Sequence, residues 1–378
     1  MFIALVLISC YAFSVFGLLS IMKGLSFPIF NTKSPAGAPR FSLEDPIEKQ
    51  KYFSYKAGPE IEKLKEFLHN NTFVAILLGP KNSGKGTYTK LFMEAVGSEH
   101  VAHISVGDIV RGLNKEISAE DSKKSLVDFL KTRYRGFVSI DKALDVVAGR
   151  DTTTLMPTEL ILASLEREID RIGRKAIFID GFPRTLDQIS YSLFLRALIG
   201  YRNDPDLFVF IDVPEAVVDE RIKNRVVCPI CQTPRSLRLL RTKEIGYDEA
   251  IKEFYLICDT PACNGARMVA KEGDAVGIGP LRERIDKDVE IMKRLLDLRG
   301  VPQIFLRNSI SVSAARDNVD EYEITPSYRY EWDETSKKVH VTEEPWTITD
   351  DEGNEAYSLL PAPIGVSLIK QTASALGL

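Results

Sequence analysis

One glycine-rich segment of the sequence combines residue types that bind phosphate groups. Its residues are Gly79, Pro80, Lys81, Asn82, Ser83, Gly84, Lys85, Gly86 and Thr87. Glycines allow the backbone to curl so that successive N–H groups point inward, and the N-terminus of a following helix adds partial positive charge. Lys85 can then reach the outer phosphates of a nucleoside triphosphate. The segment therefore predicts a triphosphate-binding loop, against the alternative of a glycine-rich turn that binds nothing.

Four of the five cysteines form a second candidate site. Cys228 and Cys231 are separated by two residues, and Cys258 and Cys263 by four. Paired cysteines at both ends of a loop are typical of structural Zn²⁺, because four thiolates complete a tetrahedral shell and leave no open position for catalysis. Disulfides and unligated thiols are the alternatives. We predict structural zinc in a segment too small to form its own core, and a reducing compartment.

These residues need a scaffold, and the sequence predicts a parallel α/β sheet flanked by helices. Short, continuous apolar runs alternate with amphipathic helical patterns, which is typical of a parallel sheet buried on both faces. The five predicted strands are 73–78, 101–105, 176–179, 207–211 and 303–306. The predicted helices are 59–68, 85–96, 157–172, 185–199, 214–225 and 280–298. The glycine-rich loop thus joins the first strand to its helix.

Two stretches interrupt this alternation, and both ends of the chain differ from it in composition. The first interruption, 112–155, carries two helical patterns, and the second, 226–277, carries the cysteines. Residues 23–58 are rich in Pro, Ser, Gly and Lys, and we expect them to run along the surface as a leader. Over 309–378, Tyr, Trp, Thr and Val with acidic turns predict a small β-rich appendage of hairpins.

Composition and charge exclude several classes of protein. Apolar residues make up 44% and charged residues 27% of the 378 residues, which suits a globular chain with one large domain carrying inserts or with two domains. Lys and Arg total 49 against 53 for Asp and Glu, so the net charge is −4. Without a polybasic field, the chain is not expected to bind long nucleic acid.

The glycine-rich loop and three later segments resemble the adenylate kinases and related nucleoside monophosphate kinases. Most phosphate-binding loops have Ser or Thr directly after the lysine, whereas Gly-Lys-Gly-Thr is typical of this family. The later segments are 103–111 (His-Ile-Ser-Val-Gly-Asp-Ile-Val-Arg), 180–184 (Asp-Gly-Phe-Pro-Arg) and the pair Arg221 and Arg225, followed by Arg284. The resemblance covers about residues 72–308. The cysteine quartet is similar to the zinc-binding lid of some bacterial adenylate kinases.

The resemblance implies an enzyme that reversibly transfers a phosphoryl group from ATP-Mg²⁺ to a nucleoside monophosphate, with AMP as the expected acceptor and two ADP as products. It also implies a kinase domain over 59–308, with a monophosphate-binding insert at 106–172 and a lid at 226–277. We expect a monomer.

The resemblance assigns functional roles to specific positions of this sequence. The catalytic residues implied by the resemblance are Lys85, Arg184, Arg221, Arg225 and Arg284. The residues implied for ATP and Mg²⁺ are Gly79, Asn82, Ser83, Gly84, Lys85, Gly86, Thr87, Asp180, Arg221 and Arg225. Those implied for the monophosphate are Ser105, Val106, Asp108, Arg111, Gly181, Arg184 and Gln188. Their types agree with these roles, since arginine forks bind phosphate oxygens and a carboxylate at the sheet edge can hold Mg²⁺ through water. The alternatives are a helix-capping Asp180, solvated surface arginines and a helix-surface Gln188.

Three features of the sequence depart from the family pattern. Val106 replaces the usual Thr near the acceptor base. The first interruption is longer than the family's segment, and within it Arg150 and Thr153 are only candidates. The usual lid arginine is missing, and the candidates to replace it are Lys271 or Arg267, before a single recognisable Asp274. The missing lid arginine and the changed loop positions Lys81 and Asn82 motivate a second hypothesis, a nucleotide-sensing protein that uses the lid or the C-terminal appendage to contact a partner.

The first 22 residues contain no Lys, Arg, Asp or Glu and are almost wholly apolar. They are long enough to span a bilayer, and Lys23, Lys33 and Arg40 after them would keep the rest of the chain on the cytoplasmic side. The interpretation we favour is that translation begins at Met22. Either interpretation predicts a cytoplasmic main body.

Overall fold

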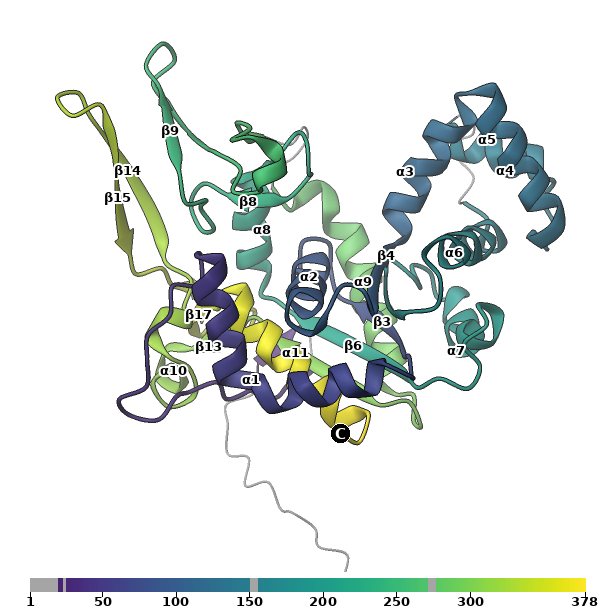
Figure 1. The fold of residues 1–378 in the computed structure, drawn as a ribbon, viewed down its shortest axis with the longest axis horizontal. Helices are drawn as coiled ribbons and strands as arrows, with labels where there is room; N and C mark the ends of the chain where they lie inside the picture. The colour runs from purple at the N-terminus through teal and green to yellow at the C-terminus, as the bar shows by residue number, and fades with distance from the viewer. Residues whose placement is uncertain (1–19, 23–24, 150–155, 271–276) are drawn as a thin grey trace, which may run out of the picture.

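A five-stranded parallel sheet forms the centre of the computed structural model, which describes residues 20–22, 25–149, 156–270 and 277–378 (Figure 1). In spatial order the strands are β12 (Gln303–Arg307), β6 (Asp206–Asp212), β3 (Val74–Leu78), β5 (Ala176–Asp180) and β4 (Val101–Ser105). Each strand runs parallel to its neighbours. The predicted fold class and the five predicted strands are confirmed.

Both faces of the sheet are buried, as the continuous apolar runs predict. Alternate residues of β3 enter different cores: Ala75 and Leu77 pack on one face, and Val74 and Ile76 on the other. The helices next to these strands are α2 (Lys85–Val96), α6 (Thr158–Ile172), α7 (Gln188–Leu198), α8 (Glu215–Lys223) and α9 (Arg282–Leu296). Because parallel strands end at one edge, the loops after β3, β5 and β12 gather there.

The N-terminal segment is not a surface leader, which corrects the sequence-based expectation. Helix α1 (Pro46–Leu68) begins well before Pro59 and is kinked at Ala57. Asp45 caps it by accepting hydrogen bonds from the N–H groups of Ile47 and Glu48. The buried side chains on its first half include Tyr52 and Phe53. Proline is favoured in a first helical turn, so Pro59 just after the kink resembled a helix start.

The C-terminal segment contains the predicted β structure and also an unpredicted helix. A hairpin is formed by β14 (Ser327–Asp333) and β15 (Lys338–Glu344), and a small sheet by β13 (Ser309–Ser311), β17 (Glu355–Ser358) and β16 (Ile348–Thr349). Helix α10 (Val312–Asn318) and η3 (Glu321–Glu323) lie between them along the chain. The final helix, α11 (Pro361–Ala375), contacts α1, α2 and β12, so it belongs to the main core (Figure 1).

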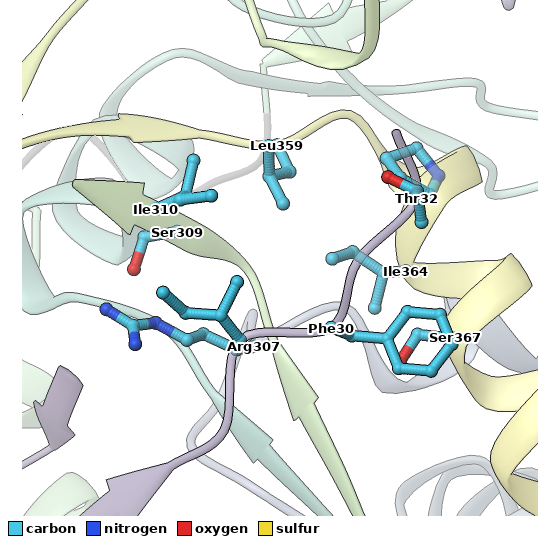
Figure 2. A pocket seen from close by; sticks show the side chains of 10 residues that line it. Phe30, Thr32, Arg307, Ser309, Ile310, Leu359, Ile364 and Ser367 are labelled. Carbon is cyan, nitrogen blue, oxygen red and sulfur yellow. The ribbon is translucent and has the colours of Figure 1, made fainter. Parts of the chain in front are cut away.

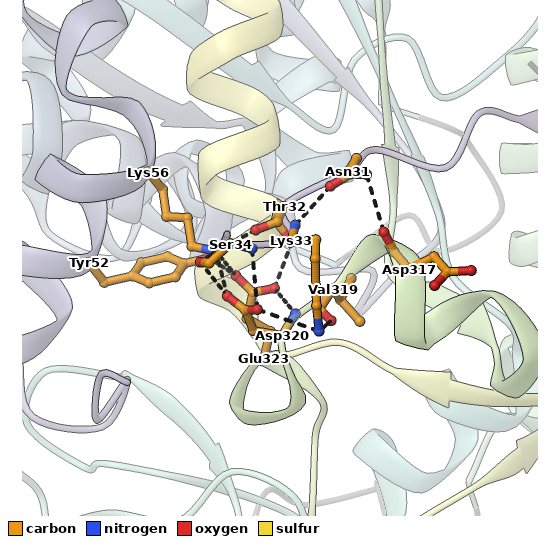
Figure 3. Close-up of polar contacts among 10 residues, drawn as sticks. All are labelled: Asn31, Thr32, Lys33, Ser34, Tyr52, Lys56, Asp317, Val319, Asp320 and Glu323. Atoms are coloured by element: carbon orange, nitrogen blue, oxygen red, sulfur yellow. Dashed lines mark hydrogen bonds and ion pairs between the residues drawn. The ribbon is translucent and has the colours of Figure 1, made fainter. Parts of the chain in front are cut away.

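A buried polar network ties the N-terminal segment to the C-terminal one (Figure 3). Thr32 and Tyr52 donate to the two carboxylate oxygens of Glu323, at 2.7 and 2.6 Å. Lys56 forms ion pairs with Asp320 at 2.8 Å and with Glu323 at 3.3 Å. Segments more than 250 residues apart in the sequence are therefore held together by charge-assisted hydrogen bonds.

A small pocket lies beside this junction (Figure 2). Its lining comes from the N-terminal segment, from the end of β12 with β13, and from the start of α11. The lining residues are Ile29, Phe30, Thr32, Arg307, Ser309, Ile310, Leu359, Pro363, Ile364 and Ser367. The pocket therefore lies where the N-terminal segment packs against the C-terminal segment beside the sheet.

Two inserts project from the edge of the sheet that carries the glycine-rich loop (Figure 1). The first comprises α3 (Val106–Ile117), α4 (Glu120–Arg133) and α5 (Ile140–Val147), which share a small apolar core with α6. The second corresponds in sequence to the predicted lid and is called the lid below. It comprises β7 (Arg225–Val227), β8 (Pro234–Ser236), β9 (Ile245–Asp248), β10 (Glu253–Leu256), η1 (Pro261–Cys263) and β11 (Val269–Ala270), and η2 (Gly279–Leu281) leads from it into α9.

Near the N-terminus, β1 (Ser20–Met22) pairs with β2 (Leu25–Phe27). Within the described ranges, no helix has both the length and the apolar character required to cross a bilayer. Nearly all of the apolar N-terminal segment, residues 1–19, lies outside the described residues.

Candidate active site and metal centre

The glycine-rich loop adopts a conformation that requires glycine at specific positions. Gly84, directly before α2, has a left-handed backbone with φ of 102°. A Cβ atom there would lie 2.5 Å from the ring of Tyr88, and one at Gly79 would lie 2.8 Å from Ser83 Oγ. Asn82 also has a positive φ, of 67°. The loop therefore curls tightly at the end of β3, as the phosphate-binding prediction requires.

Lys85 lies at the start of α2 and folds back over the loop. Its Nζ donates to the carbonyl oxygens of Gly79 and Pro80 at 2.7 and 2.9 Å, and lies 3.7 Å from the carboxylate of Asp180. Asp180 ends β5, the strand next to β3, so the sheet itself sets this proximity. Thr87 follows in the first turn of α2. The structure thus brings Lys85 and Asp180 together at the sheet edge.

Two buried polar atoms of the loop have no hydrogen-bond partner within the described ranges. They are the hydroxyl oxygen of Ser83 and the amide nitrogen of Asn82. Such groups are rare in folded proteins because each unmet hydrogen bond costs about 1–3 kcal/mol. Both side chains lie on the loop that Lys85 covers, and both can donate to phosphate oxygens. The donor set therefore fits an anionic ligand.

Two arginines at the base of the lid converge on the same loop. Arg221, on α8, donates from Nη1 to the backbone oxygen of Asn82 at 3.5 Å and from Nη2 to Oδ1 of Asn308 at 2.9 Å. Arg225, at the start of β7, donates to Oδ1 of Asn82. The structure therefore places both predicted lid arginines at the mouth of the loop.

Arg111 and Arg184 converge beside the first turn of α3. A Cβ atom at Gly107 would lie 3.5 Å from Arg111 Nη1, 3.6 Å from Arg184 Nη2 and 3.6 Å from Ser105 Oγ. Ser105 also caps α3 by accepting from the N–H of Asp108. Burial lowers the pKa of the Arg184 guanidinium and nearby Arg284 lowers it further, while Asp180 opposes this change. A cluster of cations this close favours binding of an anion.

The other residues predicted to bind the acceptor differ in how they are placed relative to Arg111 and Arg184. Asp108 and Arg111 form an ion pair on the surface of α3. Gly181 has φ of 86°, and a Cβ atom there would lie 2.8 Å from Arg184 Nη2, so glycine allows the guanidinium to approach. Val106 is buried in the core, so only its backbone is available to a ligand.

Gln188 is not a helix-surface residue, which excludes that alternative. Only 4% of it is exposed. Its Oε1 accepts from the backbone N–H of Arg184 at 2.8 Å, and its Nε2 donates to the hydroxyl of Thr158 at 3.0 Å. The side chain therefore links the loop after β5 to α6. Its reading of a base stays a prediction.

Two ionisable residues near the loop had no predicted role. Asp288 lies one helical turn after Arg284 on α9, and burial raises its pKa while Lys85, Arg284 and Arg184 oppose that rise. The sequence signal that could have pointed to Asp288 is its i, i+4 spacing from Arg284 on the same helix. His103, on β4, lies beside Gly86, and burial lowers its pKa. Both are polar groups held next to the predicted phosphate site.

The four lid cysteines form a cluster whose dimensions suit one metal ion. Their sulfur atoms all lie within 4.8 Å of one another, and none of the four is in a disulfide. The Cys231 and Cys258 sulfurs are 3.7 Å apart. Four sulfurs about 2.3 Å from a tetrahedral Zn²⁺ would be about 3.8 Å apart. The residues therefore fit structural zinc, and the disulfide alternative is excluded in this conformation.

The ionisation of these thiols agrees with a cation site. Burial raises the pKa of Cys231, but hydrogen bonds with Thr233 and Thr260 outweigh it and lower that pKa to about 5. Burial and hydrogen bonds to neighbouring cysteines raise the pKa of Cys263 to about 12. The pKa of Cys231 is therefore lowered and that of Cys263 raised, and a bound divalent cation would favour the thiolate form of its ligands.

Among the candidates for the missing lid arginine, Arg267 is engaged within the lid. It forms an ion pair with Asp248 at 2.9 Å and stacks on the ring of Tyr255 at 4.1 Å. The other lid candidates, Lys271 and Asp274, lie outside the described residues, as do Arg150 and Thr153 in the first insert.

Comparisons with known proteins show that part of the chain is similar in sequence to one group of enzymes. No protein-family model matches the chain. It is 31% identical over 213 residues to an adenylate kinase of Clostridium acetobutylicum, which covers 56% of this chain and 79% of that enzyme. It is 30% identical over 171 residues to an adenylate kinase of Thermotoga neapolitana and 31% identical over 171 residues to one of Thermotoga maritima. Each of these matches covers 45% of this chain and 66%, just under two thirds, of the relative.

Proposed function

The chain belongs to the adenylate kinase family, and from this we propose that it transfers the γ-phosphoryl group of ATP to AMP, giving two ADP. The observation that carries the proposal is the convergence of cations on the glycine-rich loop. Lys85, Arg221 and Arg225 approach it from α2 and from the base of the lid, next to the Ser83 hydroxyl, which has no partner among the residues that the structure describes. Phosphoryl transfer depends mainly on alignment and charge neutralisation, so no general base is required.

On the donor side, the chain's own groups would bind the triphosphate. The inward N–H groups of the loop and the Nζ of Lys85 would bind the β- and γ-phosphates. Asp180, 3.7 Å from Lys85, would hold Mg²⁺ through water. The magnesium ion supplies charge neutralisation at the transferring group.

On the acceptor side, Arg111 and Arg184 would bind the phosphate of the monophosphate. Both lie beside Gly107 at the start of α3, where Ser105 is also close. Arg184 is held in place because Gln188 accepts from its backbone N–H. Arg284, which interacts electrostatically with Arg184, would neutralise charge between the two nucleotides.

The lid would close over the reacting phosphates and exclude water. Its apolar core is small and includes three of the four cysteines. Zinc bound by Cys228, Cys231, Cys258 and Cys263 would supply the cross-link that this core lacks. The role of the metal is therefore structural.

A coupled assay for ADP formation tests the proposal. Purified protein is given ATP-Mg²⁺ with AMP, and in separate reactions with CMP, GMP or UMP. We expect turnover with AMP and a much lower kcat/KM with the pyrimidine monophosphates. ATP binding without turnover with any monophosphate would contradict the proposal and favour the nucleotide-sensing alternative. Highest kcat/KM with another monophosphate would keep the kinase and replace AMP as its acceptor.

A further inference from the structure

Asn308 follows β12 and contacts three elements around the donor side of the candidate site. It is fully buried. Its Oδ1 accepts from Arg221 Nη2 at 2.9 Å and from Ser358 Oγ at 3.0 Å. Its Nδ2 donates to the hydroxyl of Tyr88 at 3.0 Å and to the carbonyl of Leu359 at 3.1 Å. The amide therefore joins α8, α2 and the C-terminal segment.

These contacts fix the direction of the amide. A backbone carbonyl can only accept, so the NH₂ group must face Leu359, and Oδ1 must then face Arg221. The backbone of Asn308 is held as well, because its N–H donates to Asp212 and its carbonyl accepts from Leu359 at 2.8 Å. The acceptor offered to Arg221 thus has little freedom to move.

The partners of Asn308 also reach the phosphate-binding loop. The ring of Tyr88 fills the space beside Gly84, where a Cβ atom would lie 2.5 Å from it. The other nitrogen of Arg221, Nη1, is 3.5 Å from the backbone oxygen of Asn82. The guanidinium therefore spans from the loop to Asn308. A free arginine side chain loses rotamer entropy when it is fixed, so a side chain already held by Asn308 would lose less on binding phosphate.

We propose that Asn308 is a positioning residue that holds the Arg221 guanidinium at the mouth of the loop for the donor nucleotide. Ser358 and Leu359, in the C-terminal segment, fix Asn308 in turn. The inference rests on the proposed function to the extent that Arg221 binds the donor. It assigns to the C-terminal segment, which lies beyond the region of family resemblance, a part in building the donor site.

A double-mutant cycle tests this. Asn308→Ala and Arg221→Ala are made singly and together in the full chain, and the Kd for ATP is measured by calorimetry beside KM for ATP and AMP. We expect Asn308→Ala to raise Kd and KM for ATP roughly tenfold, as for loss of one charge-assisted hydrogen bond, and KM for AMP less than about twofold. In the Arg221→Ala background the same change should alter ATP binding less than about twofold. Full additivity, or equal increases for ATP and AMP, would overturn the proposal.

Two further variants separate positioning from folding. Asn308→Asp keeps an acceptor for Arg221 but loses the donor to Leu359. If it folds like the unaltered protein in urea unfolding, we expect its ATP binding to lie within about threefold of the unaltered protein. Ser358→Ala removes one bond to Oδ1 and should weaken ATP binding by about two- to threefold, which keeps the test open if Asn308→Ala does not fold. Asn318→Ala, a matched loss of one amide hydrogen bond in α10, should leave ATP binding unchanged.

The two proposals can fail separately. If the unaltered protein binds ATP but does not turn over, the proposed function fails, and the binding cycle still decides the role of Asn308. If Asn308→Asp has the stability of the unaltered protein and still binds ATP as weakly as Asn308→Ala, the acceptor for Arg221 is not what matters, and the role of Asn308 is overturned while the kinase proposal stands.

Discussion

The ring of Tyr247 in the lid stacks on the indole of Trp332 in the C-terminal hairpin, with centroids 4.8 Å apart and planes 26° apart. Beside this pair, Phe254 of the lid packs against Tyr330, and Lys337 forms an ion pair with Glu249 at 3.2 Å. A two-stranded hairpin is marginal by itself in water, so packing on the lid stabilises both elements. In Figure 1 the hairpin β14–β15 and the lid strand β9 project side by side.

Trp332→Ala should loosen the lid while leaving the central sheet intact. Losing the stacked indole should lower the local stability of the lid by about 1–3 kcal/mol. Hydrogen exchange of β9 and β10 should then become faster by a corresponding factor. Arg329→Ala provides the control, because Arg329 is exposed on the opposite face of the same strand. Equal exchange in both variants would show that the aromatic contact does not hold the lid.

Lys85→Ala should lower kcat by several orders of magnitude with little loss of fold stability, because Lys85 would contact the transferring phosphate. Lys90→Ala is the matched control, since Lys90 is exposed on the same helix. Steady-state kinetics and thermal unfolding of both variants check the prediction. A near-normal rate in Lys85→Ala would remove the central assignment of the site.

Gln188→Ala should narrow the preference for AMP over other monophosphates, because a site that hydrogen-bonds one base edge loses its discriminator. The substitution also removes the contacts to Arg184 and Thr158, so the Michaelis constant for every monophosphate should rise. The ratio of kcat/KM values between AMP and CMP separates the two effects. An unchanged ratio would mean that Gln188 only supports the loop after β5.

Purified protein should contain about one zinc per chain, and Cys258→Ser should destabilise the lid locally. Elemental analysis measures the metal, and limited proteolysis should show new cleavage within 226–277. ATP binding at the glycine-rich loop should be largely retained, because the central sheet does not depend on the lid for its packing. Absence of metal together with an unaltered lid in Cys258→Ser would contradict the zinc assignment.

Asp320→Asn should destabilise the fold at neutral pH, and the difference should shrink in acid. Burial raises the pKa of Asp320, but hydrogen bonds from Lys56 and Ser34 outweigh it, so the folded pKa lies below the ordinary value of 3.8. A carboxylate whose pKa is lowered on folding contributes stability that is fully present at pH values above its ordinary pKa of 3.8. This stability is lost as the pH falls through the folded pKa. We expect Asp320→Asn to cost about 2 kcal/mol at pH 7, because Lys56 loses one of its two carboxylate partners.

Urea unfolding of both proteins at pH 7 and between pH 2 and 4 measures this difference. Asp317→Asn, at an exposed carboxylate in the same segment, should behave like the unaltered protein at each pH. A difference between Asp320→Asn and the unaltered protein that does not change with pH would contradict the assigned ionisation.

Much of the fold and of the candidate site could be predicted from the sequence because the relevant signals are local. The run from Val74 to Leu78 is continuously apolar and is followed by an amphipathic helix, a pattern that predicts a strand buried on both faces. The glycines after it, the lysine and the next helix follow within a few residues. The spacing of the four cysteines similarly predicted a common metal site, and the structure brings their sulfurs together.

What only the tertiary structure decided concerns contacts between distant parts of the chain. Helix α11 carries apolar residues, but only its packing against α1, α2 and β12 shows that it completes the core. From the sequence, Gln188 is expected to read the acceptor base, with a helix-surface position as the alternative, and only its contacts with Arg184 and Thr158 exclude that alternative. The hydrogen-bonded residues Thr32 and Glu323 are 291 positions apart in the sequence, and the hydrogen-bonded pair Arg221 and Asn308 is 87 positions apart. Local periodicity determines which segments become strands and helices, whereas the partner of a buried polar group depends on how those segments pack, and no local pattern encodes that.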